Sequence, residues 1–165
     1  MVVFADLQCP YCKIYDVEIN PTIIRTYVRT GKIRLYFSGM DFVGKDSNRG
    51  LKAAAAAAAQ NRLWNVINLL YVNQGRENAG WLSDKMITAV AKATPGLDLK
   101  RFDSDHKGKA IDARMKNWQA LAAGAGVDST PTFFVGRPGK LAPLQVSQLQ
   151  ASQFTAALDK LVKST

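Results

Sequence analysis

Apolar and polar residues follow two different spacings along this chain, and the spacing predicts where strands and helices lie. The apolar run VVFA (2–5) predicts a short buried strand. A helix is predicted to begin at Cys9 or Pro10, because proline is favoured in the first turn of a helix. Asn20-Pro21 is expected to break or kink this helix, which then continues as far as Gly31.

A second strand and a loop are predicted next. KIRLYFSG (32–39) has the composition of a strand, and MDFVGKDSN (40–48) has that of a loop. Asp46 or Ser47 is expected to cap the helix that follows, because both side chains accept hydrogen bonds from the free N–H groups at a helix start.

The chain from about 48 to 124 has helical spacing. Seven consecutive alanines (53–59) are strong helix formers that let neighbouring elements approach closely. Ser83 is predicted to cap a helix that Pro95-Gly96 terminates. Further helices are predicted in the segments 62–74, 97–108 and 110–126.

The pattern changes again towards the C-terminus. STPTFFV (129–135) predicts a short strand, GRPGK (136–140) a turn and LAPLQV (141–146) another strand. SQFTAALDKLVKST (152–165) predicts a closing helix with Ser152 as its cap. The element order predicts an α/β domain built from residues 1–46 and 127–165, interrupted by an all-helical insertion at 47–126.

Composition limits the classes of function. The 165 residues suffice for one domain with an insertion, and the chain needs no disulfide staples to fold. The net charge of +9 raises the question of nucleic acid, but the basic residues are scattered among acidic ones, so nucleic-acid binding is not expected. No apolar run is long enough to span a membrane, and no signal peptide is evident at the start.

Both cysteines of the chain, Cys9 and Cys12, lie in the segment FADLQCPYCKIYD (4–16). A disulfide that closes so short a loop removes little chain entropy, so it does little as a staple. Half of a zinc site is an alternative, but zinc needs four ligands and the one histidine, His106, is distant in sequence. His106 stands in a charged segment and is expected to be exposed. Chance occurrence is the remaining alternative.

A redox role has a physical mechanism. A cysteine at a helix N-terminus faces unpaired N–H groups and the positive end of the helix dipole, and both favour thiolate over thiol. Cys9 is expected to be exposed at the helix tip, with Cys12 three residues later on the same face. The pair is therefore predicted to form a reversible dithiol switch, since only a thiolate attacks a disulfide.

Thr130-Pro131 is a second candidate element. Alone it is weak, because Thr-Pro before a strand also occurs as a plain strand-entry turn. An X-Pro bond can be cis at modest cost. A cis bond here would hold backbone groups of Thr130 beside the cysteines, open to an extended peptide.

Three segments together resemble the DsbA-like thiol-disulfide oxidoreductases: VVFADLQCPYC (2–12), the helical stretch from Lys45 to Tyr71, and VDSTPTFFVG (127–136). The match covers nearly the whole chain. The resemblance implies a thioredoxin fold with a helical insertion and an oxidase that acts on exported proteins. It implies neither a cofactor nor a metal.

The same resemblance assigns roles to six residues. Cys9 is the nucleophile and Cys12 the resolving thiol. The implied partners are unfolded or partly folded proteins with cysteine thiols, and a redox protein that recycles the enzyme. The other four residues are Thr130 and the cis-proline Pro131, which meet the substrate, and Pro10 and Tyr11, which tune the thiolate.

The sequence departs from the family pattern in two places. Family members usually carry a signal sequence or anchor and a leading edge strand before this point, and both are expected to be absent from this sequence. An extracytoplasmic location is expected from the resemblance alone. Many also carry a buried acid six residues before the first cysteine, where this chain has Val3. Asp6 is nearer to Cys9, and is interpreted as a polar loop residue rather than a proton acceptor.

Rival functions remain open on this sequence. CPYC also occurs in glutaredoxins, which are shorter and lack the insertion. The same dithiol serves a reductase or an isomerase, and the direction of electron flow is not fixed by the two residues between the cysteines. A thioredoxin-like binding module with an incidental CxxC is the alternative outside enzymes. The oligomeric state is not predicted.

Overall fold

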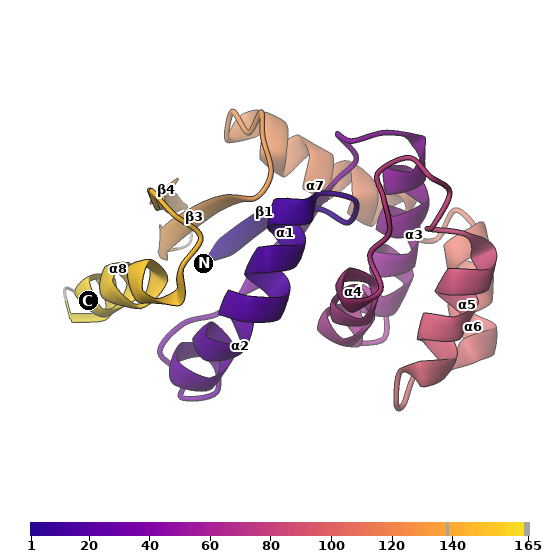
Figure 1. Ribbon diagram of the computed structural model, residues 1–165, viewed down its shortest axis with the longest axis horizontal. Coiled ribbons are helices and arrows are strands. Elements are labelled where there is room, and N and C mark those ends of the chain that lie inside the picture. Colours follow the sequence, from indigo (N-terminus) through magenta and orange to yellow (C-terminus); the bar gives the residue numbers. More distant parts are fainter. Residues whose placement is uncertain (138, 164–165) are drawn as a thin grey trace.

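A four-stranded mixed sheet forms the centre of the molecule in this computed structural model, which describes residues 1–137 and 139–163 (Figure 1). The strand order is β2-β1-β3-β4. β1 pairs with β2 in parallel and with β3 in antiparallel fashion, and β3 and β4 form an antiparallel hairpin. The strands are β1 (Val2–Asp6), β2 (Tyr36–Met40), β3 (Thr132–Arg137) and β4 (Lys140–Pro143).

The connection from β1 to β2 is a continuous helical crossover. It contains α1 (Pro10–Ile14), the π-helix η1 (Tyr15–Ile19), α2 (Asn20–Ile23) and the π-helix η2 (Ile24–Val28). The break predicted as one alternative at Asn20-Pro21 does not occur, because helical residues continue through it, but the helix is irregular there: η1 ends at Ile19 and α2 begins at Asn20. The wide π turn shifts the hydrogen bond of Asn20 N–H to the Tyr15 carbonyl, and Pro21 then falls in the first turn of α2, where its missing N–H costs little.

The second strand is shorter at its start than predicted, at 36–40 instead of 32–39. The residues before it form a turn around Gly31, whose φ of +74° is in the left-handed region that favours glycine. The N–H groups of Lys32 and Ile33 both donate to the Tyr27 carbonyl, which occupies them in the turn. Pairing with β1 therefore begins only at Tyr36, opposite Val2.

Five helices lie between β2 and β3, as the sequence predicts. α3 to α6 gather at the end of the molecule away from β4 and α8, whereas α7 returns alongside the sheet (Figure 1). Ser83 caps its helix as predicted, because Met86 N–H donates to its Oγ at 3.3 Å. The helices are α3 (Lys45–Ala58), α4 (Leu63–Val72), α5 (Asp84–Ala93), α6 (Leu99–Lys107) and α7 (Asp112–Gly124).

Two predicted caps are wrong. Gly44, not Asp46 or Ser47, occupies the cap position of α3. The two side chains are used elsewhere, since Asp46 accepts from Gly80 N–H and Ser47 Oγ accepts from the Gln8 amide. In α8 (Ala151–Lys163), Ser152 lies inside the helix rather than at its cap.

The C-terminal segments otherwise follow the sequence pattern. β4 covers 140–143, so it is shorter than the predicted 141–146. Leu144 N–H still donates to the Phe133 carbonyl, but the chain then leaves the sheet towards α8. Pro138 in the predicted turn and residues 164–165 of the predicted helix lie outside the described residues.

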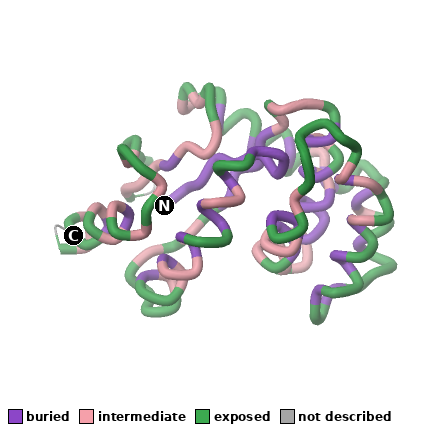
Figure 2. Tube along the Cα trace, in the orientation of Figure 1, coloured by how far each residue is buried: buried purple, intermediate pink, exposed green. Residues whose placement is uncertain are grey.

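Alternate residues of β1 face two separate apolar layers. Val3 and Ala5 join the larger core, in which Phe133 packs against Tyr15 and Phe154 with ring centroids 4.7 and 4.8 Å away. Val2 and Phe4 face the layer that includes the end of α7. Figure 2 shows β1 buried along its length, with the exposed residues on the outer helices.

His106 is buried, which contradicts the exposed position predicted for it. It is 7% exposed, and its ring stacks on Phe102 at 5.9 Å. The two residues are four apart on α6, so they share the inward face of that helix while the charged residues around them point outwards.

These elements form the α/β fold that the sequence predicts, with helices inserted between two strands of a thioredoxin-like sheet. The proposed domain boundaries, at 46/47 and 126/127, remain a prediction. Among the described residues, no helix is both long and apolar enough to cross a membrane.

Gly39 gives a test of the packing between β2 and the insertion. A Cβ there would overlap Leu51 and would lie 2.9 Å from Phe37 Cε1 and 3.2 Å from Trp118 Cε3. We expect Gly39→Ala to lower the free energy of unfolding by about 1–3 kcal/mol, measured by urea denaturation, because overpacked cores are strained. Gly124→Ala is the control, since a Cβ there meets nothing within 4 Å. Equal stabilities for the two variants would contradict this packing.

Candidate active site

The CPYC segment lies where β1 ends and α1 begins (Figure 1). β1 ends at Asp6, and Cys9 N–H donates to the Asp6 carbonyl at 3.1 Å, which closes a tight turn. Cys9 then takes the N-cap position with extended backbone angles, and Pro10 begins the helix. The strand thus delivers Cys9 to a helix N-terminus, as the sequence predicts.

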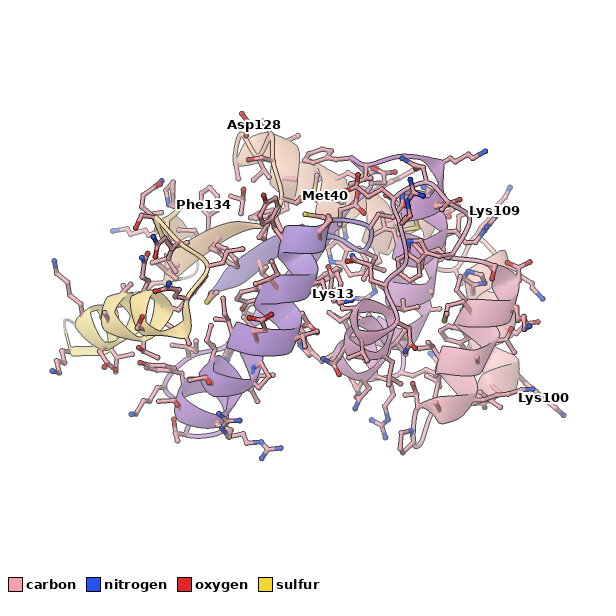
Figure 3. The ribbon with its side chains drawn as sticks, viewed as in Figure 1. Lys13, Met40, Lys100, Lys109, Asp128 and Phe134 are labelled. Atoms are coloured by element: carbon pink, nitrogen blue, oxygen red, sulfur yellow. The ribbon has the colours of Figure 1, made fainter. Side chains whose placement is uncertain are left out.

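Cys9 is less exposed than predicted. The residue is only 6% exposed, because the chain folds the distant loop at Thr130 against it. The distance from Cys9 Sγ to the Thr130 carbonyl oxygen is 3.3 Å. Cys12 is fully buried one turn along the helix, and both cysteines are free thiols in the structure. Figure 3 draws the side chains and labels Lys13, the residue that follows Cys12 on α1.

The environment of Cys9 lowers its pKa to about 6, well below that of an ordinary thiol. The largest cause is the hydrogen bond from the Cys12 thiol. Burial opposes it, but further hydrogen bonds from Thr130 and from the backbone N–H groups of Cys12 and Tyr11 add to the lowering. The sulfur therefore carries a negative charge at neutral pH.

Cys12 is held in the opposite ionisation state. Burial raises the pKa of its thiol well above the usual value, and the charge on Cys9 raises it further. The pair thus has one thiolate near the surface and one protonated thiol beneath it. This asymmetry is what a nucleophile and a resolving thiol need.

The Thr130–Pro131 peptide bond is cis in the structure. Thr130 lies against Cys9, although the two residues are 121 positions apart in the sequence. Pro131 and Thr132 line an open groove of about 390 Å³ that also reaches the exposed Tyr11. None of the described residues that line it is Asp, Glu, Lys or Arg. The remaining lining residues are Ser129, Phe133, Pro143, Leu144, Gln145, Val146, Ser147, Gln148 and Leu149.

Asp6 is not the loop residue that the sequence analysis predicted. It is the last residue of β1 and is fully buried, because its carboxylate organises the neighbouring turns. One oxygen accepts from Gln8 N–H at 2.8 Å and the other from Val43 N–H at 2.9 Å. Burial raises the pKa of Asp6, and these hydrogen bonds partly offset that rise.

Polar residues of the insertion hold the turn before Cys9, and sequence reasoning missed them. The Gln74 amide donates to the carbonyls of Leu7 and Cys9, at 2.8 and 3.1 Å. Gln8 is fully buried and exchanges hydrogen bonds with Asn78, in which Asn78 N–H donates to Gln8 Oε1 at 2.7 Å. No sequence signal distinguishes these residues from ordinary polar loop residues, because their partners lie about 70 residues away.

The described residues do not provide a ligand set for a metal ion. Among the described residues, no three His, Cys, Asp or Glu side chains come together in an arrangement that holds a metal ion.

A sequence profile of the thioredoxin family matches residues 1–160. This chain belongs to the thioredoxin family. Within it the chain is DsbA-like, and the probable disulfide bond formation protein D of Bacillus cereus is 30% identical over 138 residues. That alignment covers 82% of this chain and 64% of the relative, so the chain spans less than two thirds of that protein.

Solved structures of this DsbA-like group share the fold. Oxidised BdbD from Bacillus subtilis superposes with a TM-score of 0.82 at 18% identity, covering 98% of this chain and 86% of that one. The cytosolic disulfide reductase DsbM from Pseudomonas aeruginosa superposes with a TM-score of 0.76 at 15% identity, covering 99% and 98%. At these identities the likeness shows the fold alone.

The ionisation of Cys9 is directly measurable. We expect iodoacetamide to label Cys9 in the reduced protein with a midpoint near pH 6, because the thiolate is the reactive form and its fraction rises with pH through the pKa. Mass spectrometry of quenched samples gives the rate, with Cys9→Ser as the control for labelling of Cys12. A midpoint of about 8.5, as for a free thiol, would contradict the geometry.

The contribution of Gln74 is testable separately. Gln74→Ala leaves the Leu7 and Cys9 carbonyls without the amide donor, and we expect it to lower the free energy of unfolding by about 1–3 kcal/mol. Asn73→Ala is the matched control, since that exposed amide donates only to Leu69 in its own helix. Urea denaturation measures both, and an equal loss in the two variants would argue against a stabilising interaction between Gln74 and the turn before Cys9.

Proposed function

We propose that this protein is a thiol-disulfide oxidoreductase that oxidises cysteine pairs in exported proteins. The observation that carries the proposal is the geometry of the two cysteines: Cys9 occupies the N-cap of α1, its thiol donates to the Thr130 carbonyl, and Cys12 lies one turn deeper. These surroundings lower the pKa of Cys9. A packed scaffold without redox chemistry has no need of a thiolate at neutral pH. The family membership and the fold support the same reaction.

The reaction exchanges one disulfide for another. In the oxidised enzyme Cys9 and Cys12 share a disulfide. A substrate thiolate attacks Cys9 Sγ, the Cys9–Cys12 bond breaks, and Cys12 leaves as a thiolate that takes up a proton. The second substrate thiol, as its thiolate, then attacks the substrate sulfur of the mixed disulfide, which releases the substrate disulfide and the Cys9 thiolate. Two electrons pass from the substrate to the enzyme.

Stabilisation of the Cys9 thiolate sets the direction. Each hydrogen bond to this anion is made in the reduced enzyme and lost in the oxidised one, so the reduced form is stabilised and the disulfide becomes a stronger oxidant. A pKa of about 6 lies between the values of about 7 for thioredoxin and about 3.5 for DsbA. The name of the Bacillus cereus relative supports the oxidising direction.

Substrates are unfolded or partly folded chains that contain cysteine thiols. Backbone groups of Thr130 and the face of Pro131 meet an extended segment beside Cys9, and the groove that runs on from Tyr11 and Pro131 carries no formal charge. Binding through backbone groups suits many sequences. Pro10 and Tyr11 tune the thiolate, Pro10 by starting the helix and Tyr11 through its N–H.

The reduced enzyme is reoxidised by a redox partner protein, and the setting is extracytoplasmic. Oxidised dithiols persist where the glutathione pool does not reduce them, and exported chains acquire their disulfides there. Neither the partner nor the location follows from the geometry of the site. Both rest on the family resemblance.

Reduction of disulfides is the second candidate function. The same two thiols run the reaction backwards, and a cytosolic disulfide reductase from Pseudomonas aeruginosa shares the fold. In that direction the Cys9 thiolate attacks a substrate disulfide, and Cys12 then displaces the substrate thiolate. A binding module with inert cysteines is the third candidate, and the low pKa of Cys9 argues against it.

Stability in the two redox states distinguishes oxidase from reductase. We expect the reduced protein to be more stable than the oxidised protein at pH 8. The folded pKa of Cys9 is depressed, so its contribution is complete above the unfolded pKa and is lost as the pH falls through about 6. Between pH 8 and pH 5 the reduced form should lose about 2–3 kcal/mol relative to the oxidised form.

Urea denaturation of both forms at the two pH values measures this difference. The double variant Cys9→Ser/Cys12→Ser, which cannot form the disulfide, controls for effects of pH on the rest of the protein. An oxidised form that is the more stable at pH 8 would identify a reductase. Equal stabilities at both pH values would favour a binding module.

A further inference from the structure

The buried thiol of Cys12 raises a proton-transfer problem for the proposed reaction, on which this inference rests. Cys12 is 0% exposed, so bulk water does not reach its sulfur. When Cys12 resolves a mixed disulfide it must first lose a proton, and when it leaves the internal disulfide it must gain one. The proton therefore needs a neighbouring group that exchanges it with solvent.

Asp16 is the carboxyl group placed on this route. It follows Cys12 by four residues, at the point where α1 passes into the π-helix η1, and it is 3% exposed. Asp16 and Cys12 both line a cavity of about 10 Å³, space for about one water molecule. Trp64 and Tyr71, from α4, also line this cavity.

The same carboxyl group lines a second, larger cavity. This open cavity, of about 570 Å³, lies between the crossover helix and the insertion, and among the described residues Asp16 is the one ionisable residue that lines both spaces. The other charged residues that line this larger cavity are Arg25 and Arg29, both from the crossover helix. The lining residues from α4 and from 93–95 are uncharged. The Asp16 side chain thus borders both the small cavity beside Cys12 and the larger cavity that is open to solvent.

Two hydrogen bonds hold the Asp16 carboxylate in this position. Oδ2 accepts from Asn68 Nδ2 at 2.8 Å, and Oδ1 accepts from Asn20 Nδ2 at 3.2 Å. Both donors are neutral amides, and no cationic side chain forms an ion pair with Asp16 among the described residues. Burial raises the pKa of Asp16 and these two hydrogen bonds offset part of the rise, which brings the carboxyl closer to neutral pH, where a proton carrier is most effective.

The other titratable groups around Cys12 are already engaged. Tyr71 OH donates to the Asp6 carbonyl at 3.2 Å, and burial raises its pKa. Tyr15 OH donates to Asn20 Oδ1, and its pKa is also raised by burial. The Asp6 carboxylate accepts backbone N–H groups from the turns at Gln8 and Val43, and Asp6 lines neither cavity.

We propose that Asp16 is the proton acceptor and donor for Cys12. In the resolving step the Asp16 carboxylate takes the proton of the Cys12 thiol, directly or through one water molecule. The Cys12 thiolate attacks Cys9 Sγ of the mixed disulfide, the bond from Cys9 to the substrate sulfur breaks, and the substrate leaves as a thiolate. Asp16 then releases the proton into the larger cavity. In the oxidising direction the protonated carboxyl returns a proton to Cys12.

Reaction of the reduced protein with 5,5′-dithiobis(2-nitrobenzoate) separates the two sulfur atoms. Cys9 attacks the reagent and releases one thionitrobenzoate, and Cys12 then resolves the mixed disulfide and releases the second. Stopped-flow absorbance resolves the two phases. We expect Asp16→Asn to leave the first phase within about twofold of the wild type and to slow the second by about tenfold or more at neutral pH.

The pH profile of the second phase distinguishes proton transfer from a structural role. In the wild type this rate should rise as Asp16 ionises and then level off, whereas in Asp16→Asn it should keep rising with pH as the Cys12 thiol ionises on its own. Asp159→Asn is the matched control, because Asp159 also accepts a side-chain hydrogen bond, from Tyr27, but lines neither cavity. Both phases should be unchanged in that variant.

Asn68→Ala keeps the test decisive if Asp16→Asn fails to fold. It retains the carboxylate but removes the 2.8 Å hydrogen bond that favours the charged form, so the midpoint of the second phase should move to higher pH. Second-phase rates and midpoints equal to the wild type in Asp16→Asn or in Asn68→Ala would overturn the role of Asp16. A wild-type protein that releases a single thionitrobenzoate would instead overturn the proposed function itself.

Discussion

The site depends on one electrostatic interaction, the stabilisation of the Cys9 thiolate by hydrogen-bond donors at the start of α1. A helix N-terminus has unpaired N–H groups whatever its sequence, and here those of Tyr11 and Cys12 face the Cys9 sulfur. The Cys12 thiol adds the strongest single donor. Both sources exist only because the strand β1 ends close enough to α1 to put Cys9 at its cap.

The pKa values of the two cysteines shift in opposite directions because the two thiols lie at different depths in the protein. Cys9 stands at the end of the helix, where hydrogen-bond donors outweigh the effect of burial on its pKa. Cys12 is one turn deeper, and hydrogen bonds from Asp6 and Thr130 offset only part of the effect of burial there. Burial penalises charge, and it also raises the pKa values of Asp6 and Asp16, although hydrogen bonds to both carboxylates offset part of the rise.

The helical insertion contributes to the site as well as to the outline of the molecule. Its loop after α4 supplies Gln74 and Asn78 to the turn before Cys9, and α4 supplies Asn68 to Asp16. The same insertion bounds the larger cavity beside Asp16. A thioredoxin-like sheet without it would lack both the support of the CPYC turn and the enclosure of the acid behind Cys12.

Sequence by itself determined the elements whose signals are local. Periodicity and proline placement located β1, the start of α1 at Pro10 and the Ser83 cap, and the spacing of Cys9 and Cys12 indicated dithiol chemistry. These features depend on neighbours within a few residues, which the sequence displays directly. The start of β2, by contrast, was placed too early, because a strand begins where its partner does and Val2 is more than 30 residues away.

Tertiary structure alone decided how exposed each polar group is and what it contacts. Cys9 is covered by a loop 121 residues away, His106 turns inwards onto Phe102, and Asp6 is buried in a strand rather than free in a loop. Asp16 gave no signal in the sequence, because nothing in the string CPYCKIYD says which cavities open beside the helix. Burial, hydrogen-bond partners and hence ionisation are properties of the packed chain, and residue types specify them only after the fold has brought distant segments together.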